Sequence, residues 1–355
     1  MQRKVTVYDI ASELNISAST VSRVLNNSAL IGDEKRKLIL DTAERLGYQK
    51  RPIRRQKGRS ILNVAVFLPS AGQGYLHLFY DPAELLAGLQ EGLGDVTVNV
   101  ITSLNDPGTR LFEHKKLGDI DGCIFGFTTP ESSLLERIEE REVPVALINR
   151  RDEERNYVCA DDEAGMDRLL REMLARGRAQ RPCYVGFAPI REVTDRRRRG
   201  FLEACERHGC DAGPPDCREL GSLEELDRRF VADLLEAGYD ALMCFNDVVA
   251  VYLYQTALHL GVVPGRDFTL TGFDDSPVRQ LTERKIDTIS LSVRELGNEA
   301  GGWLERVILD RDTAPMQYLV AGAYLRGDTI ASGSDDRPDA PAPEAPSFDG
   351  KDARP

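Results

Sequence analysis

Apolar runs and amphipathic segments alternate along most of the chain after residue 60. Short apolar runs predict strands at residues 61–68, 96–101, 123–127, 143–148, 183–187, 241–245 and 268–273. Apolar positions at helical spacing predict helices at residues 82–91, 131–141, 163–176, 194–208, 223–237 and 248–260. Such alternation is typical of a parallel sheet with helices on both faces. We therefore expect an α/β body of two doubly wound subdomains, with a ligand cleft at the carboxyl ends of the strands.

Residues 1–48 carry a different pattern, in which short helical segments follow one another without a strand. Thr6 and Asp9 have the spacing of a capping box, which predicts a first helix. Asn15 stands where a tight turn needs a residue with positive φ, and Ser17 is placed to cap a second helix over 18–25. A third helix is expected from Gly32 to Gly47. The pattern predicts an all-α helix-turn-helix head.

The second helix of such a motif enters the major groove of DNA. The core of the head is expected to contain Val21, Val24 and Leu25. The short side chains at the start of the same helix are small enough to contact the edges of bases. Arg23 could donate a pair of hydrogen bonds to a guanine or contact a phosphate. The predicted DNA-binding residues of the head are Thr6, Tyr8, Ser17, Ala18, Ser19, Thr20, Ser22, Arg23 and Asn26. The alternative is a three-helix bundle that binds no nucleic acid.

Charge favours the DNA-binding interpretation. Residues 1–60 carry 13 Lys or Arg and 6 Asp or Glu, a charge of +7, whereas the remaining residues carry 33 and 52, a charge of −19. A basic head is expected to meet a polyanion that repels the acidic body.

Residues 49–60 form a basic linker that contains Pro and Gly, and we treat them as a hinge. Ile53, Arg54 and Arg55 are predicted to contact DNA there, with Ile53 as the apolar candidate for a minor-groove wedge. The alternative is a solvated tether. The body then covers residues 61–331, and residues 332–355 have too little apolar content to pack, so we expect a disordered tail.

The sequence favours a cytoplasmic protein without a membrane partner. Its seven Cys include no Cys-x-x-Cys pair, which fits a reducing compartment. No run of about 18 apolar residues is present, and no apolar signal region follows the basic N-terminal residues.

Several segments resemble the lactose-repressor (LacI/GalR) family of bacterial transcription regulators. In the head these are Thr-Val-Tyr-Asp-Ile-Ala at 6–11, Thr-Val-Ser-Arg-Val-Leu-Asn at 20–26 and Leu-Gly-Tyr at 46–48. In the body, weaker segments at 159–165, 197–201, 245–247, 272–275 and 296–297 follow in the order of the family. The resemblance covers about residues 5–331. It implies a homodimer, a palindromic double-stranded operator, a small-molecule effector, and a body like a periplasmic sugar-binding protein.

The chain departs from the family in three places. Asn15 replaces the usual turn glycine, which its tolerance of positive φ explains. The hinge lacks the family's wedge leucine and is one residue shorter. Leu291 stands where the family often has Gln.

The resemblance also implies effector contacts at strand ends, where Asn149, Arg197, Asp247 and Asp274 match family ligand positions. The carboxylate of an Asp can accept hydrogen bonds from two hydroxyl groups, which suits a polyol. The guanidinium of an Arg can donate two parallel hydrogen bonds to one ligand group. The predicted effector-binding residues are Asn149, Arg197, Asn246, Asp247, Asp274, Phe79 and Tyr75, the last two as an aromatic platform. The alternatives are a helix cap for Asp247 and a turn role for Asp274. The arginine run at 196–199 leaves an anionic effector open as well.

No motif for a catalytic nucleophile, a phosphate loop, a dinucleotide or a zinc protease is present, so we expect neither an enzyme nor a cofactor. The cysteines near His208 lack the spacing of a zinc site. The sequence therefore predicts a DNA-binding transcriptional regulator, most simply a repressor, controlled by a sugar or sugar derivative. The rival interpretations are a solute-binding protein of periplasmic type without a DNA role, and an enzyme with a regulatory head.

Overall fold

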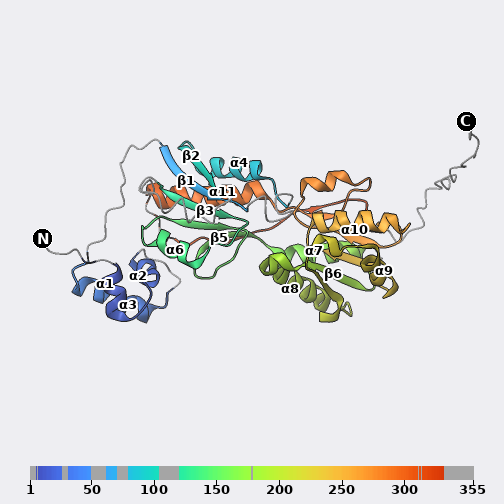
Figure 1. The fold of residues 1–355 in the computed structure, drawn as a ribbon, viewed down its shortest axis with the longest axis horizontal. Helices are drawn as coiled ribbons and strands as arrows, with labels where there is room; N and C mark the ends of the chain where they lie inside the picture. The colour runs from blue at the N-terminus through green and yellow to red at the C-terminus, as the bar shows by residue number, and fades with distance from the viewer. Residues whose placement is uncertain are drawn as a thin grey trace, which may run out of the picture.

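The computed structural model describes residues 5, 7–25, 31–48, 61–69, 79–103, 120–176, 179–310, 312 and 314–331. A small helical head and two α/β subdomains lie in a row (Figure 1). The expected hinge at 49–60 and tail at 332–355 lie outside the described residues.

The head consists of α1 (Val7–Leu14), α2 (Ala18–Leu25) and α3 (Asp33–Arg45), which confirms the predicted order and positions. Asn15 has a φ of 53°, as the turn between α1 and α2 was predicted to require. Val21 and Val24 are buried in the core of the head, and Leu25 packs against that core. The head is therefore a helix-turn-helix unit with its own apolar core.

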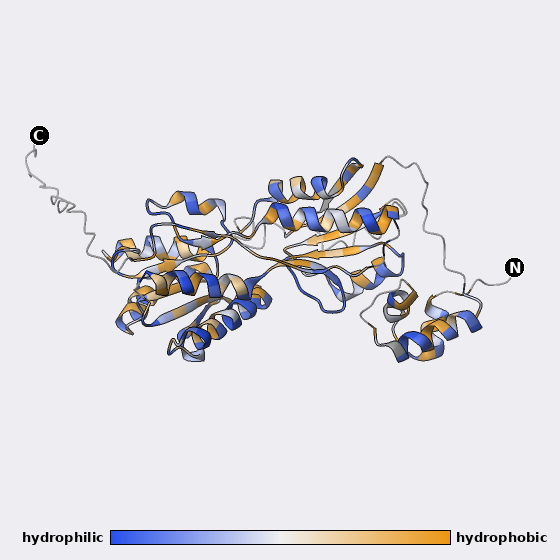
Figure 2. Cartoon of the chain, turned by 180° about the vertical axis from the view of Figure 1, so that it is seen from behind, coloured by the Kyte–Doolittle hydropathy of each residue, from blue (hydrophilic) through white to orange (hydrophobic). Residues whose placement is uncertain are grey.

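The first subdomain is built on a six-stranded parallel sheet in the order β11-β5-β4-β3-β1-β2. Its strands are β1 (Ile61–Phe67), β2 (Thr97–Ser103), β3 (Gly122–Gly126), β4 (Val145–Ile148), β5 (Asn156–Ala160) and β11 (Gln317–Val320). Helices α4 (Pro82–Gly92) and α11 (Val293–Glu305) pack on one face, and α6 (Ser132–Glu139) packs on the other. Figure 2 shows the apolar residues gathered in the strands and on the helix faces turned toward them.

The second subdomain has a four-stranded parallel sheet in the order β7-β6-β8-β9. Its strands are β6 (Pro182–Phe187), β7 (Cys217–Leu220), β8 (Ala241–Cys244) and β9 (Thr269–Thr271). Helices α7 (Asp162–Ala175) and α8 (Arg191–His208) cover one face, and α9 (Arg228–Glu236) and α10 (Asp247–His259) cover the other. A short antiparallel pair, β10 (Thr288–Ile289) with β12 (Tyr324–Leu325), packs beside α7.

The chain passes into the second subdomain after β5, returns before α11, and passes again after β11. These passages place the carboxyl ends of both sheets around one cleft, which is where open α/β sheets bind ligands. The predicted fold class, a helix-turn-helix head on an α/β body of two doubly wound subdomains, is confirmed.

Several elements differ from the prediction. The single helix expected over 223–237 is wrong, because Asp227 accepts a hydrogen bond from the amide of Phe230 and so begins α9 after a short 3-10 turn. Strands β5, β7, β10, β11 and β12 were not predicted. The signal of β11 is weak because it is an edge strand whose residues Gln317, Tyr318 and Leu319 are exposed.

Helix α11 was also not predicted, because its glycines lower helix propensity. The glycines allow the backbones of α11 and α4 to touch. A Cβ added at Gly297 would lie 2.4 Å from the carbonyl oxygen of Leu85, and one at Gly88 would lie 1.9 Å from that of Arg294. This close contact attaches the returning chain to the first subdomain.

Candidate functional site

The outward face of α2 is the first candidate site. Ser17 caps the helix as predicted, with its Oγ 3.2 Å from the amide of Thr20 and 2.7 Å from the hydroxyl of that residue. Ala18 packs partly against the core of the head, and the backbone of Ser19 lies in the first turn of α2. The cap and the apolar face together orient the opposite face of α2 away from the head.

This outward face is not exposed to solvent, which differs from the sequence expectation. Ser22 is only 5% exposed, because its hydroxyl donates to the carbonyl oxygen of Glu139 in α6 at 3.3 Å. The guanidinium of Arg23 lies 2.7 Å from the carboxylate of Glu154 and 3.7 Å from that of Glu139. A hydrogen bond to Glu140 raises the pKa of Tyr8 to about 12. Helix α2 therefore lies against the body (Figure 1).

The remaining predicted DNA contacts, Thr6, Asn26, Ile53, Arg54 and Arg55, lie outside the described residues.

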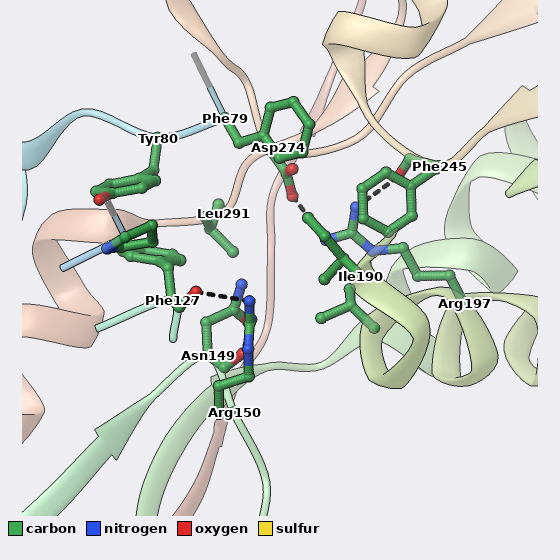
Figure 3. A pocket seen from close by; sticks show the side chains of 12 residues that line it. Phe79, Tyr80, Phe127, Asn149, Arg150, Ile190, Arg197, Phe245, Asp274 and Leu291 are labelled. Carbon is green, nitrogen blue, oxygen red and sulfur yellow. Dashed lines mark hydrogen bonds and ion pairs between the residues drawn. The ribbon is translucent and has the colours of Figure 1, made fainter. Parts of the chain in front are cut away.

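The second candidate site is a pocket between the two subdomains (Figure 3). Its empty volume is about 370 Å³, with open solvent at the mouth included. Strand ends and α8 supply most of the lining, as the switch-point rule requires. The lining residues are Pro69, Phe79, Tyr80, Phe127, Asn149, Arg150, Ile190, Val193, Arg197, Phe245, Asp274 and Leu291.

Asn149 and Arg150 follow β4 and form the polar wall on the side of the first subdomain. The Arg150 guanidinium donates to the carbonyl oxygens of Asn149 at 2.7 Å and Phe127 at 2.6 Å. Both of these residues have a φ of 57°, so Arg150 holds two strand ends in left-handed backbone. The Oδ1 atom of Asn149 is buried and has no hydrogen-bond partner among the residues that the structure describes. A buried acceptor without a partner is costly, and a ligand hydroxyl would satisfy it.

Arg197 organises the opposite wall. Its guanidinium contacts Asp162 at 2.9 Å, Asp274 at 2.6 Å and the carbonyl oxygen of Phe245, and it lies 3.9 Å from the ring centroid of Phe273. Only 1% of the Arg197 side chain is exposed. Arg197 therefore positions the Asp274 carboxylate at the pocket wall. The guanidinium hydrogen bonds that Arg197 was predicted to donate to a ligand are made to residues of the protein instead.

The carboxylates around Arg197 differ in their environment. Burial raises the pKa of Asp274, although Arg197 opposes the rise. Burial acts on Asp162 in the same direction, but Arg197 and Arg196 outweigh it and hold the pKa of Asp162 below its usual value. Asp162 therefore stays ionised and carries the compensating charge for both arginines.

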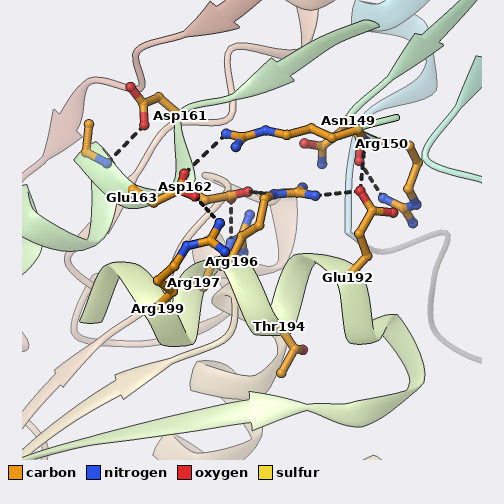
Figure 4. A network of polar contacts seen from close by, with 12 residues as sticks. Asn149, Arg150, Asp161, Asp162, Glu163, Glu192, Thr194, Arg196, Arg197 and Arg199 are labelled. Carbon is orange, nitrogen blue, oxygen red and sulfur yellow. Dashed lines mark hydrogen bonds and ion pairs between the residues drawn. The ribbon is translucent and has the colours of Figure 1, made fainter. Parts of the chain in front are cut away.

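The other arginines of the run at 196–199 are also paired (Figure 4). Arg196 contacts Asp162 at 2.7 Å and Glu192 at 2.5 Å. Arg198 pairs with Asp195 and Glu219, and Arg199 pairs with Glu163. The run therefore does not present a row of uncompensated charges to the pocket.

The predicted residues Asn246 and Asp247 are fully buried and do not line the pocket. Asn246 caps α10, because its Oδ1 accepts from the amide of Val249 at 3.0 Å. Asp247 accepts a hydrogen bond from the amide of Ser276 at 2.7 Å, and the Thr288 hydroxyl also interacts with its carboxyl group. Burial raises the pKa of Asp247 well above its usual value. A Cβ at Gly272 would lie 2.0 Å from this carboxyl, so the side chain fills space behind the wall.

Aromatic side chains form the apolar part of the pocket. Tyr80 and Phe127 stack with ring centroids 3.9 Å apart, and Phe79 packs edge-on against Phe187 at 6.0 Å. The predicted platform residue Phe79 does line the pocket, and Tyr75 lies outside the described residues.

Sequence reasoning missed most of the lining, including Tyr80, Phe127, Arg150, Phe245 and Leu291 as contact residues. Phe127, Arg150 and Phe245 end or follow predicted strands, so the rule that selected Asn149 and Asp274 also applied to them. Ile190 and Val193 reach the pocket from the start of α8, and no local signal marked them.

Among the described residues, no cluster of three or more His, Cys, Asp or Glu could hold a metal ion. No helix in that part of the chain has the length and apolar content to cross a bilayer.

Two family models match the chain. Residues 6–50 match the bacterial regulatory proteins of the lacI family, and residues 171–330 match the periplasmic binding protein-like domain. The first match covers the helix-turn-helix head, and the second covers most of the second subdomain.

Curated relatives match nearly the whole chain. The HTH-type transcriptional regulator DegA of Bacillus subtilis (strain 168) is 25% identical over 307 residues, which are 83% of this chain and 89% of DegA. The probable HTH-type transcriptional repressor ExuR of the same organism is 22% identical over 92% of this chain and 98% of ExuR.

Solved structures share the fold. A complex of the transcriptional regulator CelR with cellobiose has a TM-score of 0.65 and 19% identity, and it covers 92% of this chain and 100% of that one. The lac repressor dimer bound to operator and the anti-inducer ONPF has a TM-score of 0.63 and 18% identity, over 93% and 100% of the two chains.

Proposed function

The chain belongs to the lacI family of bacterial regulatory proteins, and on that premise we propose that it represses transcription by binding a palindromic operator as a homodimer, under the control of a small-molecule effector. In this proposal residues 1–48 read the DNA, 49–60 connect the head, and 61–331 bind the effector and dimerise. The protein acts in the cytoplasm and has no catalytic role.

The observation that carries the DNA-binding role is the geometry of α2. Its apolar side is fixed in the head, and Ser17 caps its start. Ser22 and Arg23 project from the opposite side, where a recognition helix meets bases and phosphates. One head buries too little surface for useful specificity, so two heads on successive major grooves are required.

The hydrogen bonding of the cleft arginines supports a neutral effector, such as a sugar or an uncharged sugar derivative. The arginines of the two walls already donate hydrogen bonds to carboxylates or carbonyl oxygens of the protein, so their guanidinium groups are largely used before an anion could bind. These arginines and their carboxylate partners are Arg150, Arg151, Arg196, Arg197, Asp162, Glu163, Glu192 and Asp274. The Oδ1 of Asn149 and the carboxylate of Asp274 would accept ligand hydroxyls, and the Tyr80–Phe127 stack would cover an apolar sugar face.

Calorimetric titration tests the effector class. Neutral monosaccharides and disaccharides are compared with the corresponding sugar phosphates and sugar acids. Because the cleft arginines are bonded within the protein, we expect a neutral compound to bind more tightly than its charged counterpart. Tighter binding of the charged counterpart would contradict the neutral assignment.

Effector binding would close or rotate the subdomains and so change the spacing of the two heads. The coupling equals the difference in effector affinity between the two states, of order 1–3 kcal/mol. A gel shift with duplex DNA from upstream of the gene, with and without candidate sugars, tests the whole proposal. Binding that a sugar alters supports it, and absence of DNA binding with retained sugar binding would favour a solute-binding protein.

A further inference from the structure

The contact between the head and the body uses the same side of α2 that the proposed function assigns to DNA. Ser22 donates to the carbonyl oxygen of Glu139, and Arg23 faces the carboxylates of Glu154 and Glu139. Tyr8, at the start of α1, is hydrogen-bonded to Glu140. Helix α2 cannot lie in a major groove while α6 covers this side, so the two contacts exclude each other.

The body surface offers α2 the same chemistry as a DNA backbone. The partners of Arg23 are carboxylates, which resemble phosphates as anionic acceptors of guanidinium hydrogen bonds. One of these acceptors is held firmly, because Arg155 bonds the same Glu139 oxygen that faces Arg23, and Arg155 also contacts Asp152 at 2.8 Å. The other, Glu154, is 73% exposed, so its ion pair with Arg23 is weak and exchangeable.

The segment that carries Glu154 begins at the pocket. Residues 149–155 join β4 to β5, and Asn149 and Arg150 at their start line the pocket. The next residue, Arg151, is bound to the second subdomain through Glu192 at 2.8 Å and Glu163 at 3.2 Å. A relative movement of the subdomains therefore acts on the same short segment that contacts Arg23.

We propose that in the DNA-free protein the DNA-reading side of α2 is docked on the surface formed by α6 and residues 149–155, where Glu139 and Glu154 face Arg23, and that duplex DNA competes with this surface for Ser22 and Arg23. The proposal rests on the proposed function, because it requires that this side of α2 bind DNA. The body then lowers DNA affinity by occupying the head. Effector binding alters the competition through residues 149–155.

A matched pair of substitutions in the full-length protein tests the docking. Glu154→Gln removes the carboxylate that contacts Arg23. Glu153→Gln makes the same charge change one residue away, at an exposed side chain that forms no ion pair with the described residues of the head. General repulsion between body and DNA changes equally in both variants, so it cancels in the comparison. Affinity for a labelled duplex is measured by fluorescence anisotropy at low salt.

Loss of an exposed ion pair predicts that Glu154→Gln binds duplex about 2-fold to 5-fold more tightly than Glu153→Gln. Small-angle scattering without DNA gives a second readout with the stronger pair Glu154→Lys and Glu153→Lys. Release of the head predicts a larger radius of gyration for Glu154→Lys than for Glu153→Lys.

Equal affinities and equal radii within both pairs would overturn the docking, while duplex binding by the unmodified protein would still support the proposed function. Absence of duplex binding by the unmodified protein and by all variants would overturn the proposed function and the competition with DNA. In that case a larger radius for Glu154→Lys would show that the head docks on the body without any competition from DNA.

Discussion

Two clusters of arginines and carboxylates in this protein have similar composition and opposite settings. In the cleft, Arg196 and Arg197 share Asp162, and their side chains are between 0% and 6% exposed. At the head, Arg23 contacts Glu139 and Glu154, with exposures of 15% for Arg23, 15% for Glu139 and 73% for Glu154. Burial therefore separates a cluster that holds the fold from one that is open to exchange.

The difference has an energetic basis. Charges in a buried cluster have lost their hydration, so removal of one partner leaves an uncompensated charge at a large cost. The exposed carboxylate of Glu154 keeps much of its hydration, and water or another anion replaces it beside Arg23 at little cost. The cleft cluster is suited to fixing Asp274 at the pocket wall, and the head cluster is suited to alternating between carboxylates and phosphates.

The largest expected effect is the loss of the buried carboxylate that both cleft arginines share. Asp162→Ala is predicted to lower the free energy of unfolding by about 3–5 kcal/mol, because Arg196 and Arg197 remain buried without it. Asp195→Ala is the control, since it removes the partner of Arg198 in a pair whose members are both 41% exposed. That control should cost less than about 1 kcal/mol. Similar losses in denaturant titrations of both variants would contradict the distinction by burial.

Arg23→Ala tests the exposed cluster. If Arg23 reads a guanine, the substitution should weaken operator binding by about 1–3 kcal/mol, because a bidentate base contact is lost. Arg45→Ala is the control, because Arg45 lies in α3 and pairs with Glu13 on the exposed surface of the head. Anisotropy titrations with operator and with a shuffled duplex measure both. If Arg23→Ala kept the same preference for operator over the shuffled duplex, Arg23 would not recognise a base.

Asp247 sharpens the comparison, because it is a buried carboxyl without an arginine at hydrogen-bond distance among the described residues. Burial raises the pKa of Asp247 well above 3.8, so the folded protein keeps a proton that the unfolded chain releases. The free energy of unfolding should then fall as pH rises between these two pKa values, by at most about 1.4 kcal/mol per pH unit. Asp247→Asn should lack this decrease. Parallel stability profiles of the two proteins between about pH 4 and pH 8 would contradict it.

The smallest effect is expected at the unpaired acceptor of the cleft. Asn149→Ala should weaken effector binding by about 0.5–1.5 kcal/mol, the net contribution of one hydrogen bond, and leave effector-free DNA binding unchanged. Thr256→Ala is the control, because its hydroxyl donates to the carbonyl oxygen of Leu226, remote from the pocket lining. Calorimetric titration measures the effector affinity of both variants. Equal affinities would contradict a hydrogen bond between Asn149 and the effector.

The sequence predicted those parts of the molecule that depend on neighbouring residues. Asn15 has the positive φ that the turn requires, and the rule for strand ends placed Asn149 and Asp274 at the pocket. The same rule misplaced Asp247, because its orientation depends on space left by Gly272.

Contacts between distant residues gave no local signal. Ser22 meets Glu139 across 117 positions and Arg23 meets Glu154 across 131, so the docked side of α2 was expected to be exposed. The pairing of the arginine run at 196–199 likewise depends on Asp162 and Asp274 from other elements.

The salt dependence of duplex binding by the full-length protein tests the central claim most directly, since a head that binds DNA must release counterions from the phosphates. Anisotropy titrations of one labelled duplex at increasing salt concentration should give an association constant whose logarithm falls linearly with the logarithm of the salt concentration. Duplex binding that does not change with salt, or no duplex binding at low salt, would contradict the account.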